Sequence, residues 1–148
     1  MTKDVLIKIT GLHFENGNRD DGENEEIQIL TKGEYYQRNG KNYLIYDEML
    51  EGFEEVTHCR VKYSEDSFEL LKKGSSNVHM VFQKGKKNQT YYQTPYGTMT
   101  IGLDTRDISV EEQEENIQIQ VKYGMDVNYN FLADCDISIE IQPLDYET

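Results

Sequence analysis

The chain has 148 residues, of which 36% are hydrophobic and 29% charged, and its formal net charge at pH 7 is −13. This length suits one domain whose core is large enough to fold without a metal or a disulfide, so we expect a single domain over residues 1–148. The negative charge disfavours nucleic acids and anionic membranes as partners, because both are negatively charged themselves.

Cysteine usage and the start of the sequence both predict a cytoplasmic protein. Asp4 and Lys8 interrupt the first apolar stretch, so it does not resemble a secretory signal. Cys59 and Cys135 lie within strand-like runs, which predicts two buried thiols. A disulfide between them is compatible with the sequence if their two strands are neighbours.

Apolar and polar residues alternate with a period of two through most of the chain, which is typical of antiparallel strands with one wet face. In the last and longest run, Phe131 to Ile141, the odd-numbered residues are expected to face the interior. Residues 111–116 fit either one helical turn or a solvated loop. In chain order, the alternating runs cover residues 5–10, 26–29, 57–63, 78–83, 99–103, 117–123 and 131–142.

A hairpin is predicted between residues 34 and 46, because Asn39-Gly40 supplies the two positive-φ positions of a type I′ turn. A two-residue loop pairs Tyr36 with Tyr43 and Tyr35 with Leu44. Both faces of this hairpin are aromatic or apolar, so the sequence leaves open which pair is buried.

Short strands joined by hairpins, with no stretch that fits a crossover helix, predict an all-β fold of about ten antiparallel strands. Closing such a sheet hides its edges, so we expect a closed or nearly closed barrel. A two-sheet β-sandwich is the alternative.

One stretch carries a resemblance to a known family. It runs Tyr92-Gln93-Thr94-Pro95-Tyr96-Gly97 and leads into a strand over residues 98–105. Pro95 ends the preceding strand and Gly97 allows a positive φ, so the stretch predicts a tight reversal. Supporting pieces are Tyr46-Asp47-Glu48, the strand Met80-Val81-Phe82 and the strand over residues 119–123.

In order and spacing, these pieces resemble the YwiB-like family of small bacterial proteins over about residues 2–142. The resemblance implies a calycin-like barrel, similar in shape to lipocalins. It implies no activity, because that family has no established function. Two features depart from the pattern: Lys72-Lys73-Gly74 stands where an Arg is expected near the Gly, and the first loop, residues 16–24, is longer and more acidic.

The motifs of common catalytic and cofactor sites are absent. The sequence has no G-x-S-x-G, phosphate loop or dinucleotide-binding glycine pattern. His13, His58 and His79 lack the spacing of zinc ligands. Residues 16–22 resemble the start of a calcium loop, but Asp21 stands at the required Gly and Ile27 at the required Glu. We therefore expect no catalytic residues of a known kind, no metal and no cofactor.

The leading functional hypothesis is a small molecule bound in the mouth of the barrel. Tyrosines would line such a site, and an arginine would hold an anionic group of the ligand. An acidic protein-interaction or regulatory module, using an exposed strand edge, is the alternative, and a homodimer is a further candidate assembly. An enzyme with a site of scattered residues has the least support. The candidate ligand-binding residues are Tyr46, Tyr63, Tyr92, Tyr96, Arg60 and Arg106.

Overall fold

The computed structural model describes residues 3–11, 28–49, 56–74, 77–94 and 97–144. Within these ranges there is no helix, and so none that is long and apolar enough to cross a membrane. The strands are β1 (Lys3–Thr10), β2 (Gln28–Arg38), β3 (Lys41–Met49), β4 (Val56–Tyr63), β5 (Ser67–Lys73), β6 (Val78–Gln83), β7 (Lys87–Thr94), β8 (Gly97–Gln113), β9 (Asn116–Val127) and β10 (Asn130–Pro143).

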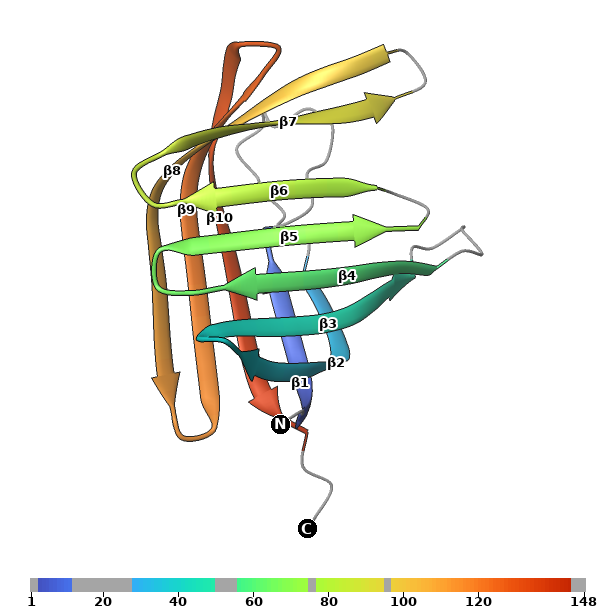
Figure 1. Ribbon diagram of the computed structural model, residues 1–148, viewed down its shortest axis with the longest axis vertical. Helices are drawn as coiled ribbons and strands as arrows, with labels where there is room; N and C mark the ends of the chain where they lie inside the picture. The colour runs from blue at the N-terminus through green and yellow to red at the C-terminus, as the bar shows by residue number, and fades with distance from the viewer. Residues whose placement is uncertain (1–2, 12–27, 50–55, 75–76, 95–96, 145–148) are drawn as a thin grey trace.

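The ten strands form one sheet in the order β6–β5–β4–β3–β2–β1–β10–β9–β8–β7, and each neighbouring pair is antiparallel. In Figure 1, strands β3 to β7 run across the front of β8, β9, β10 and β1, so the sheet wraps around one interior. The predicted all-β antiparallel fold is confirmed. One continuous sheet replaces the two separate sheets of the sandwich alternative.

The barrel is nearly closed, because β6 and β7 meet without forming a ladder in the described part of the chain. A turn at residues 84–86 joins them, and the Thr90 hydroxyl donates a hydrogen bond to the His79 carbonyl oxygen at 2.6 Å. At the other end of β7, Gly97 has a φ of +126°, as its predicted role in a reversal requires.

The core consists of the inward side chains of the alternating runs. On β4, Cys59, Val61 and Tyr63 are buried and His58 is exposed, as the alternation predicts. The Phe82 ring packs edge-on against Tyr123 from the opposite wall, with their centroids 4.8 Å apart. The core residues are Val5, Ile7, Ile9, Leu44, Tyr46, Cys59, Val61, Tyr63, Phe68, Leu70, Met80, Phe82, Leu103, Ile108, Ile119, Val121, Tyr123, Met125, Ile137, Ile139 and Ile141.

The predicted hairpin forms between β2 and β3 in the expected register. Asn39 and Gly40 have φ values of +54° and +76°, which a type I′ turn needs. Leu44 is fully buried, whereas the Tyr36 and Tyr43 rings stack on the outer face with centroids 4.8 Å apart. The face that carries Leu44 is therefore the inner face.

Three expectations from the sequence need correction, and one alternative is resolved. Phe131 is 65% exposed, because a β-bulge between Phe131 and Ala133 shifts the register and reverses the alternation there. The segment 111–116 is not a helical turn: its first three residues end β8, and a two-residue turn leads into β9. Cys59 and Cys135 form no disulfide, because they lie on β4 and β10, which are not neighbours. Cys59 is buried, but Cys135 is only half-buried, so the prediction of two buried thiols is wrong for Cys135.

Candidate functional site

The structure separates the candidate ligand-binding residues that it describes. Tyr46 and Tyr63 point into the barrel and are buried. Arg60 is exposed on β4, because its buried neighbours Cys59 and Val61 take the inward positions. Tyr92 is half-buried on β7, and Tyr96 lies outside the described residues.

Arg106 also lies on the outer face of the barrel. It sits where the β8–β9 register shifts between Thr105 and Asp107, and its guanidinium donates to the Asp134 carboxylate. Because Arg60 and Arg106 both face outward, neither guanidinium joins Tyr46 and Tyr63 in the interior.

Other polar side chains do accompany Tyr46 inside the barrel, at the end where β3 ends and β4 begins. The side chain of Glu48 points inward from β3, and the side chain of Lys72 points inward from β5, as the alternation along each strand requires. Tyr46 pairs with Cys59, and Cys59 with Lys72, so one row crosses three strands. Together with these residues, Thr57 completes the interior polar cluster: Tyr46, Glu48, Thr57, Cys59 and Lys72.

An ion pair lies at the centre of the interior polar cluster. The Lys72 Nζ atom donates to the two carboxylate oxygens of Glu48 at 3.2 and 3.3 Å. Both side chains are more than nine-tenths buried. Taking two charges out of water is costly, so such a pair persists only when each charge is compensated by its surroundings.

Burial keeps the other titratable groups of this cluster neutral. It raises the pKa of the Cys59 thiol to about 12; the nearby Glu48 charge adds to that rise and the Lys72 charge opposes it. Burial also raises the pKa of the Tyr46 hydroxyl above its ordinary value, with smaller contributions from Cys59 and Glu48. At neutral pH the cluster therefore presents a protonated thiol and a protonated phenol.

The chemistry of this cluster suits binding better than catalysis. A thiol that stays protonated is a poor nucleophile. No group of three or more His, Cys, Asp or Glu side chains among the described residues is arranged to hold a metal ion. The Tyr46 hydroxyl is buried next to the Cys59 thiol, which is a weak acceptor, and it has no nitrogen or oxygen partner within the described ranges. A buried hydroxyl of this kind can donate to a ligand.

Two other buried tyrosines lie elsewhere in the interior. Tyr63 is at the opposite end of β4, next to Tyr35. Tyr123 on β9 pairs with Cys135 on β10. Burial raises the pKa of both phenols, with smaller contributions from Tyr35 at Tyr63 and from Cys135 at Tyr123. Of the ion pairs between described residues, only Lys72–Glu48 has both side chains more than nine-tenths buried, and its Glu48 charge acts on the Tyr46 hydroxyl.

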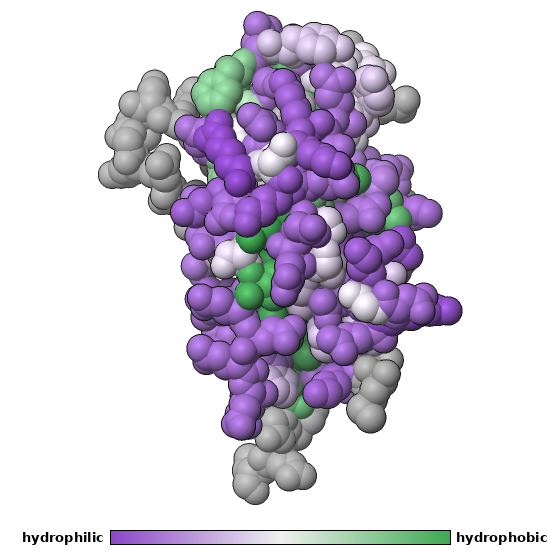
Figure 2. Space-filling view, turned by 60° about the vertical axis from the view of Figure 1, so that its left-hand side comes forward, coloured by the Kyte–Doolittle hydropathy of each residue, from purple (hydrophilic) through white to green (hydrophobic). Residues whose placement is uncertain are grey.

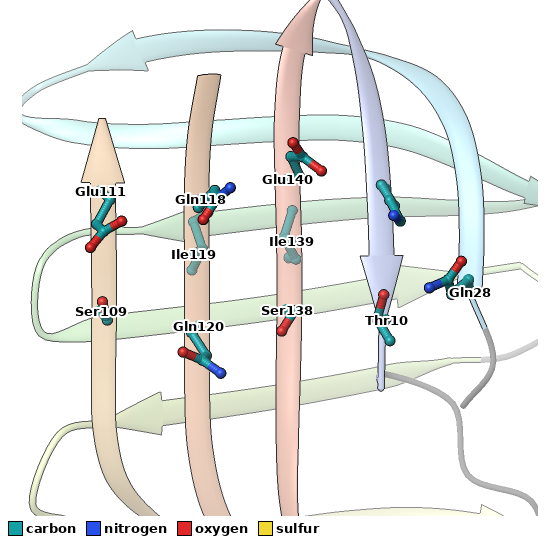
Figure 3. Close-up of a pocket in the computed structure, with 11 residues that line it drawn as sticks. Thr10, Gln28, Ser109, Glu111, Gln118, Ile119, Gln120, Ser138, Ile139 and Glu140 are labelled. Atoms are coloured by element: carbon teal, nitrogen blue, oxygen red, sulfur yellow. The ribbon is translucent and has the colours of Figure 1, made fainter. Parts of the chain in front are cut away.

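The outer surface has a shallow groove of about 450 Å³ over β8, β9, β10, β1 and β2 (Figure 3). Its floor is a cross-strand row in which each residue pairs with the next. None of the described residues that line the groove is aromatic, and the groove is open to solvent, so these residues offer little apolar surface to a ligand. The row consists of Ser109, Gln120, Ser138, Thr10 and Gln28.

The fold and this interior define a nearly closed antiparallel β-barrel with a polar cluster at one end. The family model described as "Domain of unknown function (DUF1934)" matches residues 12–139. The chain therefore belongs to that family.

The chain is similar to the uncharacterized beta-barrel protein YwiB of Bacillus subtilis (strain 168). The two are 29% identical over 116 residues, which cover 78% of this chain and 80% of YwiB. The fold also matches the crystal structure of the ywiB protein from Bacillus subtilis, with a TM-score of 0.76 and 21% identity over 97% of this chain and 94% of that chain. The resemblance to the YwiB-like family is thus confirmed.

Sequence reasoning missed Glu48 and Lys72 as interior residues. The signal was present, because each occupies the inward phase of its run: Leu44, Tyr46 and Glu48 on β3, and Phe68, Leu70 and Lys72 on β5. Charged residues are seldom fully buried unless paired, so their inward phase could have been read as a buried ion pair.

Proposed function

We propose that the barrel binds a small polar molecule inside the end that carries the interior polar cluster. The observation that supports this most strongly is the unpartnered Tyr46 hydroxyl beside the Lys72–Glu48 ion pair, all of them shielded from water. An unmade hydrogen bond at a buried phenol is costly, so a ligand atom that accepts from the Tyr46 hydroxyl would stabilise this end of the barrel.

The charge balance of the cluster indicates the class of ligand. Lys72 and Glu48 form a buried ion pair, and a ligand with a net charge would bring a further charge into this region of low dielectric. A ligand that is uncharged or zwitterionic avoids that cost. It would accept a hydrogen bond from the Tyr46 hydroxyl and place its apolar part against the core.

Native mass spectrometry of the protein purified from its own host tests the proposal. We expect the folded protein to carry a small molecule that is released on denaturation. Tyr46→Phe removes one hydroxyl without changing the ring, and we expect it to lower the bound fraction. Tyr43→Phe is the matched control, because the Tyr43 ring stacks on Tyr36 outside the barrel.

Two results would overturn the proposal. One is a wild-type protein whose mass in the native state equals that of its chain alone, which would leave a buried water as the partner of Tyr46. The other is equal ligand retention by Tyr46→Phe and Tyr43→Phe, which would place any bound molecule elsewhere.

A further inference from the structure

Strand β8 is longer than the strand that pairs with it on one side. β7 covers only Gly97–Asp104 of β8, and the turn before β7 holds Thr105 through two backbone hydrogen bonds of 3.0 Å. From Asp107 to Gln113, β8 pairs with β9 alone among the described strands. We call this edge of β8, which no described strand covers, the free edge.

The direction of the backbone groups along that edge follows from the ladder. Gln113 and Asn116 close a two-residue hairpin, so the backbone groups of Gln113 point toward β9. Because alternate residues of a strand point their backbone groups to opposite sides, those of Ile108, Val110 and Glu112 point away from β9. No described strand pairs with these three residues on that side.

The surroundings of this edge combine apolar surface with uncompensated negative charge. Ile108 and Val110 turn their side chains toward the core. On the side of the molecule where β8 lies in Figure 1, Figure 2 shows a narrow hydrophobic band between hydrophilic surfaces. Four glutamates, 111, 112, 114 and 115, are exposed at and beyond the end of β8, and no ion pair to them occurs within the described ranges.

We infer that the free edge of β8, residues 108–113, accepts a basic extended segment of a partner protein as an additional strand. The outward backbone groups of Ile108, Val110 and Glu112 would pair with the main chain of that segment. The glutamates would attract its lysines or arginines and would raise its rate of association.

The same charge argues against a second copy of this chain as the occupant. Two β8 edges paired together would bring their glutamates close to one another, and each chain carries a net charge of −13. Charged residues on an edge are a common protection against pairing of identical chains. A basic strand meets no such repulsion.

Amide hydrogen exchange with a synthetic peptide of alternating lysine and valine, ten residues long, tests the inference. In the free protein we expect fast exchange at Ile108, Val110 and Glu112, and slow exchange at Ser109 and Glu111, which bond to β9. The peptide should slow exchange at the first three residues and leave the other two unchanged. A peptide of alternating glutamate and valine should have no effect.

Variants separate backbone pairing from charge. Val110→Pro removes an amide that faces outward and spares the β8–β9 ladder, and we expect it to weaken peptide binding about tenfold. Val110→Ala keeps the amide and should bind like the wild type. If Val110→Pro does not fold, Glu111→Gln combined with Glu114→Gln and Glu115→Gln should weaken binding about as much at low salt.

Three results would overturn the inference. The first is protection that is absent or that spreads equally over all five amides. The second is peptide binding that added salt does not weaken. The third is sedimentation of the protein alone as a dimer with the same three amides protected, which would assign the edge to a homodimer.

Discussion

Glu48 and Lys72 reach each other across β4, with the ammonium nitrogen 3.2 Å from one carboxylate oxygen, although their own strands β3 and β5 do not pair. Both side chains point inward from strand ends. The intervening strand contributes Thr57 and Cys59 to the same interior region. The ion pair therefore links β3 to β5 across β4 at one end of the barrel.

Removing one partner of this ion pair should destabilise the barrel strongly. Lys72→Met leaves the Glu48 carboxylate buried without its cation, and we expect a loss of about 3 kcal/mol in the free energy of unfolding. Replacing both, as Lys72→Met with Glu48→Leu, should recover most of that loss, because the double variant buries no charge. Urea unfolding of the three proteins measures both effects. A double variant that is less stable than Lys72→Met would show that the pair itself stabilises the fold.

The stability of the barrel should fall as the pH rises above about 9. The Cys59 thiol has a folded-state pKa of about 12 against an ordinary value of 9.0. Between these values the unfolded chain releases the proton that the folded chain retains, so unfolding is favoured as the pH rises. Burial raises the pKa of Tyr46, Tyr63 and Tyr123 in the same direction.

Urea midpoints measured from pH 7 to pH 11 check this dependence. Cys59→Val removes one of the titrating groups while keeping an apolar side chain of similar size. We expect its stability to decline less steeply with pH than that of the wild type. Identical slopes for the two proteins would mean that the Cys59 thiol is not shielded in the folded state.

The fold could be predicted because each inward face is apolar and each outward face polar. Val121 and Tyr123 on β9, for example, alternate with Gln120 and Lys122 in both sequence and structure. The prediction was wrong at Phe131, since a bulge adds one residue to β10 and a period-two pattern carries no sign of it. Register shifts depend on contacts between strands, which the sequence of one strand does not specify.

The candidate site was harder to predict than the fold. Residue type alone predicts that Tyr46 and Tyr63 share one site, but Tyr46 lies on β3 opposite Cys59, whereas Tyr63 is the last residue of β4 and lies opposite Asn42. The charge of Arg60 made it a candidate anchor for an anionic ligand, but its position in the alternation of β4 turns its side chain outward. Phase along the strand separates inner from outer positions, but the end of the barrel that a residue occupies depends on the register of all ten strands.

Gly33 lies where β2 parts from β3, and it should tolerate no side chain. A Cβ atom there would be 2.6 Å from the Ile45 carbonyl oxygen and 2.6 Å from the Ile7 Cδ1 atom. Because one of these contacts is backbone, Gly33→Ala should cost about 3 kcal/mol of stability.

Gly40→Ala is the matched control for this substitution. Nothing lies within 4 Å of a Cβ atom at Gly40, so only its positive φ of +76° opposes the change. We expect a loss of about 1 kcal/mol. Thermal or urea unfolding compares the two variants, and a smaller loss for Gly33→Ala than for Gly40→Ala would mean that β2 can move away from β3 at this point.

Arg106 and Asp134 form an ion pair on the outer face, where both side chains are at least half exposed. Exposed ion pairs contribute little, so Arg106→Ala should change the free energy of unfolding by less than about 1 kcal/mol. The guanidinium lies over Gly124 on the outside of the barrel, whereas the Tyr46 hydroxyl is buried in its interior. We therefore expect Arg106→Ala to retain any small molecule that native mass spectrometry detects in the wild type. Loss of that molecule from Arg106→Ala, with retention by Tyr46→Phe, would place the ligand on the outer face beside Asp134.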